Sequence, residues 1–181
     1  MSITYQKNFE ALSKVNPMIA EKVTNTRIEK EDFEVLQSKN GKDFTIKIDI
    51  CGKSKLVHSL YRPVEQAKKT VDKIGLEYYN LIGVTGIGCG HYIREIVNRF
   101  ENKDSRVVIM ETRLDILKEV MKYQDLTDIF LSNSTVIVDV SDSSYTVNMK
   151  NTLSRLHFSA LMAGNVQLFK TPALKEKERD K

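Results

Sequence analysis

The chain has 181 residues, with 28 Lys and Arg against 24 Asp and Glu, which gives a formal net charge of +4 with histidine neutral. This length suits one domain, or one domain with a small appendage, and 41% hydrophobic with 29% charged residues predicts a globular protein rather than a disordered or fibrous one. No stretch approaches the ~18 to 20 apolar residues of a membrane-spanning helix, and the polar start lacks the apolar region of a signal peptide. We therefore expect a cytoplasmic protein with no membrane partner.

The cysteine, histidine and basic residues give no sign of a metal site or of a nucleic-acid surface. Cys51 and Cys89 lie far apart, and His58, His91 and His157 are scattered, so no metal-ligand spacing occurs. Lys and Arg alternate with acidic residues along the chain, and no basic stripe emerges that would follow phosphates. We expect two reduced thiols, no bound metal and no nucleic-acid partner.

The beginning of the chain predicts a helix followed by a small antiparallel sheet. Apolar residues recur at steps of three and four over 8–23, which is typical of one helical face, and Pro17 is expected to divide this helix or to start a second one. Farther on, apolar and polar residues alternate, and Asn40-Gly41 between two such runs predicts a hairpin with a type I′ turn. A further turn extends the hairpin into an antiparallel meander over about residues 32–58.

Beyond the meander, strands and helices alternate. Pro63 at a first helical position and Gly75 just past a last turn predict a helix over about 63–74. The elements expected after it are, in chain order, a strand over 79–85, a glycine loop, a helix over 91–100, a strand over 106–111, helices over 114–123 and 126–131, a strand over 135–140, a helix carrying Met149, Leu153 and Leu156, and a strand over 166–169. Continuous apolar strands that alternate with helices predict a parallel sheet covered on both faces.

The predicted fold class is therefore α/β. We expect a Rossmann-like, mostly parallel sheet with helices on both faces, preceded by an N-terminal helix and a small antiparallel β-meander. In domain terms, residues 1–60 hold the helix and meander, 61–169 form the Rossmann-like domain, and 170–181 are a charged tail or a linker to a missing domain.

The glycine loop before the helix that begins at His91 carries the most functional information. Gly86, Gly88 and Gly90 let the backbone turn tightly and let a ligand approach main-chain N–H groups, while the helix N-terminus favours an anion or a ribose. Their spacing is closer to the nucleoside-binding loop of S-adenosylmethionine methyltransferases than to the dinucleotide pattern. Glu111 ends the next strand 25 residues after Gly86, close to the ~20 residues at which an acid meets a ribose diol.

The loop thus predicts a site for a nucleotide or an S-adenosylmethionine-like ligand, and a purely structural explanation stays open beside it. A tight strand-to-helix turn favours glycine in any α/β protein, and Val84 stands where methyltransferases carry an acid. A histidine at the start of a helix serves capping or packing as readily as acid–base chemistry, and no catalytic residues can be assigned from the sequence. The candidate cofactor-binding residues are Gly86, Gly88, Gly90, His91 and Glu111.

Four blocks of residues occur in an order and spacing that point to one family. They are Tyr5, Asn8, Phe9 and Leu12 with Asn16-Pro17; His58-Ser59, Tyr61, Pro63 and Gln66-Ala67; Gly86, Gly88 and Gly90 through Glu95; and Val108-Ile109 and Glu111 with 126–131. Together they resemble the N-terminal domain of the motility-associated factor (Maf) flagellin glycosyltransferases. The resemblance covers most of the chain from Tyr5 to Val140.

The resemblance implies a multidomain cytoplasmic enzyme that transfers nonulosonic acids from CMP-activated donors to Ser or Thr of flagellin. Its transferase chemistry would lie in a central domain after this segment, so the chain would be an accessory domain without the catalytic centre, with flagellin or the downstream transferase domain as partner. Only the glycine loop and Glu111 carry over from the family, without an assigned role. Two alternatives stay open: an S-adenosylmethionine-dependent methyltransferase or other nucleotide-binding Rossmann-like protein, and an interaction module that uses the N-terminal helix and hairpin.

Overall fold

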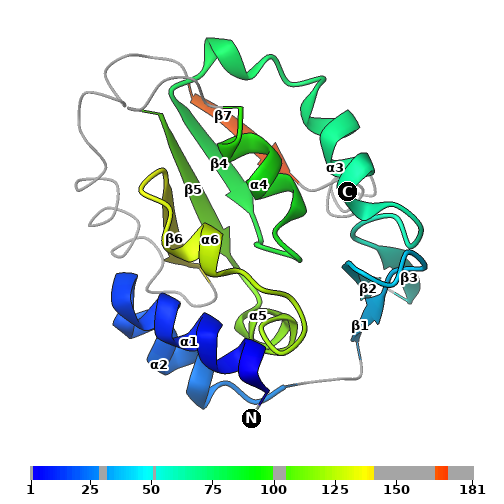
Figure 1. The fold of residues 1–181 in the computed structure, drawn as a ribbon, viewed down its shortest axis with the longest axis vertical. Coiled ribbons are helices and arrows are strands. Elements are labelled where there is room, and N and C mark those ends of the chain that lie inside the picture. Colours follow the sequence, from blue (N-terminus) through cyan, green and yellow to red (C-terminus); the bar gives the residue numbers. More distant parts are fainter. Residues whose placement is uncertain (1, 29–31, 51, 100–104, 141–165, 171–181) are drawn as a thin grey trace.

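The computed structural model describes residues 2–28, 32–50, 52–99, 105–140 and 166–170 (Figure 1). It is a mixed α/β fold with a four-stranded parallel sheet, a three-stranded antiparallel sheet and two N-terminal helices. Within these described residues, no helix has the length and apolar character needed to cross a membrane. The predicted fold class is confirmed.

The N-terminal helices are α1 (Ile3–Val15) and α2 (Pro17–Asn25). The Ser2 side chain caps α1, and the Asn16 side chain accepts the Ile19 N–H at the start of α2. Pro17 occupies the first turn of α2, where its missing N–H costs nothing, so the second of the two predicted roles for this proline is the correct one. The two helices lie side by side and pack on the helices that follow β5 (Figure 1).

The antiparallel sheet has the predicted meander order, with β1 (Phe33–Gln37) and β3 (Lys53–Leu56) on either side of β2 (Phe44–Ile50). The hairpin between β1 and β2 exists, but its turn is not the two-residue type I′ turn that was expected. The connection runs over residues 38–43, where the Asn40 side-chain oxygen accepts the backbone N–H groups of Lys42 and Asp43. An Asx turn of this kind uses asparagine through its side chain rather than through a positive φ.

The parallel sheet has the strand order β6-β5-β4-β7. Its strands are β4 (Leu81–Thr85), β5 (Arg106–Glu111), β6 (Thr135–Asp139) and β7 (Val166–Lys170). The helices around it are α3 (Pro63–Val71), α4 (His91–Val97), α5 (Leu114–Val120) and α6 (Thr127–Phe130), with a short 3₁₀ turn η1 (Leu76–Tyr78). Because β4 is central and pairs with both β5 and β7, the loop that follows it lies at the middle of the sheet's carboxyl edge.

One continuous hydrophobic core joins the parallel sheet to the N-terminal part of the chain. Ile82 and Val84 point from β4 into this core, which also includes Leu12 of α1 and Ile46 of β2. The opposite face of the sheet carries a smaller cluster built on Leu81, Val108 and Val138. The proposed boundary between 1–60 and 61–169 stays a prediction, since the core includes residues from both sides of it.

Some expectations lie outside the described residues. These are the helix with Met149, Leu153 and Leu156, the state of Cys51, and nearly all of the 170–181 tail. The strand predicted over 166–169 is present as β7, one residue longer. It pairs with β4 as an edge strand of the parallel sheet, so a segment far along the sequence lies beside the strand that precedes the glycine loop.

Candidate functional site

The glycine loop leaves the carboxyl end of β4 with three glycines at positive φ: +73° at Gly86, +53° at Gly88 and +80° at Gly90. A Cβ built on Gly90 would lie 2.5 Å from the Ile129 Cδ1 atom, so α6 packs directly on this glycine. A Cβ on Gly86 would meet no atom within 4 Å. The loop is therefore closed against the protein at its helix end and open at its strand end.

Glu111 lies beside this loop, as the sequence predicted, but both of its carboxylate oxygens bind backbone. One oxygen accepts the Ile87 N–H at 2.8 Å, and the other accepts the Arg113 N–H at 2.8 Å. The side chain is buried, and this burial raises its pKa, while the N–H groups act in the opposite direction. Glu111 thus ties the glycine loop to the end of β5, and whether it also meets a ribose stays a prediction.

His91 begins α4 and reaches across to the meander rather than to solvent. Its Nε2 lies 2.9 Å from the Phe44 carbonyl oxygen, and because a carbonyl only accepts, Nε2 carries the proton. Burial lowers the pKa of His91, more than its hydrogen bond to Phe44 raises it. A neutral imidazole that donates to a backbone carbonyl is a packing and anchoring group in this structure.

His58 is a neighbour of the loop that was not among the predicted site residues. It follows the meander, is 2% exposed, and packs edge-on against His91 with ring centroids 4.9 Å apart. Its other neighbour is Tyr92, at 4.5 Å between ring centroids. Burial, followed by repulsion from the positive charge that a protonated His91 would carry, lowers the pKa of His58 to about 3, so the ring is neutral at ordinary pH.

The His58 ring also covers the middle of the glycine loop. A Cβ on Gly88 would lie 3.7 Å from His58 Nε2 and 3.7 Å from Val57 Cγ1. The segment that leaves β3 is therefore in van der Waals contact with the loop. A weak signal for this was present in the sequence: His58-Ser59 stands in one of the family-like blocks, between the meander and the Pro63 helix.

The two histidines and the one cysteine at the loop, His58, His91 and Cys89, are buried and neutral. Burial raises the pKa of the Cys89 thiol to about 12, which keeps it protonated and unreactive. Among the described residues, no three His, Cys, Asp or Glu side chains group into a place that could hold a metal ion. The structure thus brings all five predicted residues together around one loop and shows them holding that loop in place; ligand binding by the loop stays a prediction.

Comparison with known proteins shows a similarity of fold but no match in sequence. No family model matches the sequence, and no curated protein matches it. The structure is similar to that of a Maf glycosyltransferase from Magnetospirillum magneticum AMB-1 over 98% of this chain, with a TM-score of 0.56 and 11% sequence identity. It also overlaps with MnmC2 from Aquifex aeolicus over 72% of this chain and 50% of that one, at 15% identity. The TM-score of this overlap is 0.38, which is too low to show a shared fold.

The first of these similarities shows a shared Rossmann-like fold. The chain spans 34% of the Maf glycosyltransferase, about a third of its length. The predicted family resemblance is therefore supported at the level of a Maf-like fold.

Proposed function

We propose that this chain is an accessory N-terminal domain of a motility-associated flagellin glycosyltransferase and does not itself contain the catalytic centre. The proposal is supported by the Maf-like fold over 98% of the chain and by the ordered family-like blocks of its sequence. The parent enzyme would transfer a nonulosonic acid from a CMP-sugar to flagellin Ser or Thr.

The observation that carries the proposal is that the middle and the helix end of the glycine loop are covered by the chain's own residues. Glu111 accepts the Ile87 N–H, His58 covers Gly88, and Ile129 packs on Gly90. A loop that binds a nucleotide needs its N–H groups and its neighbouring acid free for phosphate or ribose. A loop filled in this way suits a rigid support better than a donor-binding site.

This interpretation gives the domain a positioning role. Since the chain corresponds to 34% of the Maf glycosyltransferase, the transferase chemistry would belong to a segment outside it. The domain would then hold flagellin near that segment, or keep the transferase domain in its active arrangement. Either role needs a stable core and a partner surface, without a reactive group at the loop.

Two measurements test the proposal. The purified 181-residue chain is incubated with a CMP-nonulosonate and unmodified flagellin, and the flagellin mass is followed; we expect no sugar addition. In parallel, the source DNA is read beyond codon 181, and any continuing frame is expressed with and without residues 1–181. Transfer that requires this segment supports an accessory role, whereas sugar addition by the 181-residue chain alone would refute it.

A second candidate function is a nucleotide or S-adenosylmethionine site, and the open position of Gly86 favours it. Nothing lies within 4 Å of a Cβ built there, at the edge of the sheet where α/β proteins bind ligands. A thermal-shift series with S-adenosylmethionine, NAD and CMP decides the matter, because a ligand at ten times its Kd stabilises by about 1.4 kcal/mol. A rise in melting temperature that is lost in the Gly86→Asp variant and retained in the Gly41→Asp variant would support this function. No rise at millimolar ligand would exclude it.

A further inference from the structure

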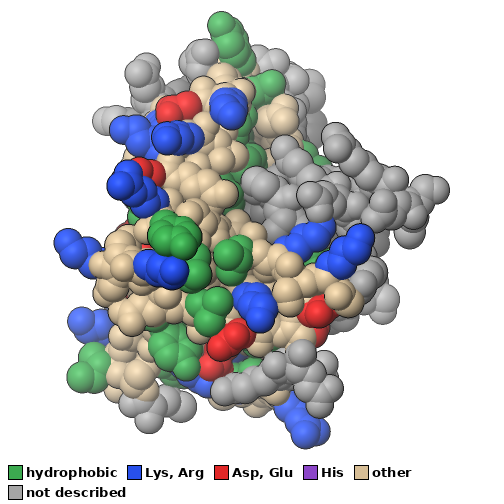
Figure 2. Space-filling view, turned by 90° about the vertical axis from the view of Figure 1, so that its right-hand side faces the viewer, with side chains coloured by type: hydrophobic (Ala, Val, Ile, Leu, Met, Phe, Trp, Pro, Cys, Tyr) green, Lys and Arg blue, Asp and Glu red, His purple; other side chains and the backbone are tan. Residues whose placement is uncertain are grey.

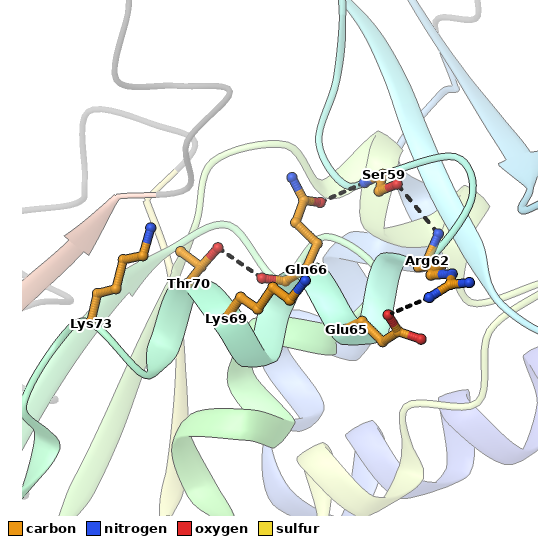
Figure 3. Close-up of a pocket in the computed structure, with 7 residues that line it drawn as sticks. All are labelled: Ser59, Arg62, Glu65, Gln66, Lys69, Thr70 and Lys73. Carbon is orange, nitrogen blue, oxygen red and sulfur yellow. Dashed lines mark hydrogen bonds and ion pairs between the residues drawn. The ribbon is translucent and has the colours of Figure 1, made fainter.

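A polar groove runs along α3 and the turn before it (Figure 3). Its volume is about 600 Å³, within the ~300 to 1,000 Å³ typical of small-molecule sites. The residues that line it are Ser59, Arg62, Glu65, Gln66, Lys69, Thr70 and Lys73. The residues among them that belong to α3 are spaced by three and four and so lie on one side of the helix.

Positive charge is concentrated at one end of the groove. Arg62 pairs with Glu65 at 3.2 Å, so the end of the groove at the start of α3 is neutral as a whole. At the other end, neither Lys69 nor Lys73 has an ion-pair partner among the described residues. Figure 3 shows Arg62 and Lys73 at opposite ends of the row of side chains. Lys69 lies in the last turn of α3 and Lys73 in the turn that follows the helix, and both line the groove.

Hydrogen bonds inside the groove occupy the Gln66 and Ser59 side-chain oxygens, and the Glu65 carboxylate is paired with Arg62. Gln66 Oε1 accepts the Ser59 N–H at 2.5 Å, and Ser59 Oγ accepts the N–H groups of Tyr61 and Arg62. The lysine ammonium groups and the Gln66 side-chain N–H₂ remain as donors with no acceptor in the described part of the chain. Such a surface is suited to a ligand rich in acceptor oxygens.

We propose that this groove binds a small phosphorylated polyol, of the sugar phosphate class, with its phosphate between Lys69 and Lys73. A phosphate ester carries about −1.5 to −2 charges at pH 7, which matches two lysines better than a single carboxylate does. The hydroxyl groups of the ligand would lie along the neutral half of the groove, toward Gln66 and Ser59.

The same lining argues against a protein partner at this groove. Protein interfaces rely on buried aromatic and apolar anchors, and none of the residues that line the groove is apolar or aromatic. Lys and Arg side chains are spread widely over this face of the molecule, with acids between them (Figure 2). The test must therefore distinguish binding by Lys69 and Lys73 from non-specific attraction of an anion to the positive charge of this face. The proposal does not depend on the function proposed above.

Calorimetric titration of the full chain provides the test, with glucose 6-phosphate, inorganic phosphate, glucose and hexaglutamate as ligands. We expect glucose 6-phosphate to bind most tightly, inorganic phosphate more weakly, and glucose not at all. K69Q/K73Q should weaken glucose 6-phosphate binding about tenfold or more, because two charge-assisted contacts are lost.

Lys68→Gln is the matched control, since Lys68 lies on α3 but does not line the groove. It should leave binding unchanged within about twofold. Equal loss in Lys68→Gln and K69Q/K73Q would overturn the proposal, as would no binding at millimolar glucose 6-phosphate. Tighter binding of hexaglutamate would overturn it in favour of an acidic peptide. Circular dichroism of each variant establishes that the fold is retained.

Discussion

Replacing Gly90 with alanine tests whether the glycine loop is a packed part of the core. Gly90 has φ +80°, and its added Cβ would lie 2.5 Å from Ile129 Cδ1 and 3.0 Å from Leu126 Cδ2. Both neighbours are side-chain ends, but Ile129 is 2% exposed and Leu126 0%, so neither can move into solvent. The methyl group must therefore strain the backbone and also overpack the core.

The magnitude follows from two separate costs. Holding alanine in the left-handed region costs about 1 to 2 kcal/mol. Inserting a methyl group into a well-packed core costs about 1 to 3 kcal/mol more. We expect Gly90→Ala to lower the free energy of unfolding by roughly 2 to 5 kcal/mol, which is a large part of the ~5 to 15 kcal/mol typical of a domain.

Gly86→Ala is the matched control, because Gly86 has a similar φ of +73° and no atom within 4 Å of its added Cβ. It should show the backbone cost alone. Urea unfolding followed by circular dichroism measures both variants, and at a slope of about 2 kcal/mol per molar urea their midpoints should differ by about 0.5 to 1.5 M. Equal midpoints would refute the claim that α6 packs tightly on the loop.

Three further changes test the residues around the loop. The unfolded chain protonates His58 near the ordinary histidine pKa of 6.5, whereas the folded chain does so near about 3, so stability falls as pH drops through this window, by up to about 1.4 kcal/mol per pH unit. The free energy of unfolding of the wild type should therefore fall from pH 7 to pH 4.5 relative to that of His58→Gln, which has no group to protonate at this position. A difference between the two proteins that stays constant over this range would contradict a neutral, buried His58 ring. Asn8→Ala should cost roughly 3 to 5 kcal/mol in urea unfolding, because this buried side chain makes hydrogen bonds to three backbone groups near α6; the exposed Gln6→Ala should cost little. Glu111→Gln should cost about 1 to 3 kcal/mol, since an amide can accept only one of the two N–H groups that the carboxylate now binds, and unchanged stability would show that these bonds contribute nothing.

Local patterns predicted the elements well wherever burial follows a simple period. The β5 strand matches its expected range, and the predicted helices start where Pro63 and His91 suggested. Helix ends were placed too late: α4 ends at Val97 rather than at 100, and α5 at Val120 rather than at 123. Periodicity reports which residues are apolar, and it does not report where the last helical hydrogen bond is made.

The candidate site was predicted as a set of residues, without its arrangement. The glycine loop and Glu111 are neighbours, as the order of strand and loop implied. His58 was missed because a histidine after a meander has no periodic signature of its own. The groove along α3 was missed because its lining residues are separated in sequence and share one groove only in the folded chain.

The sequence by itself determined the α/β class, the meander and the glycine loop. These features depend on neighbours within a few residues, through caps, turns and hydrophobic period. Only the tertiary structure decided that His58 covers Gly88, that Ile129 packs on Gly90, and that Glu111 binds backbone. Those contacts join segments far apart in the chain, and their geometry is set by the packing of a shared core that no local pattern encodes.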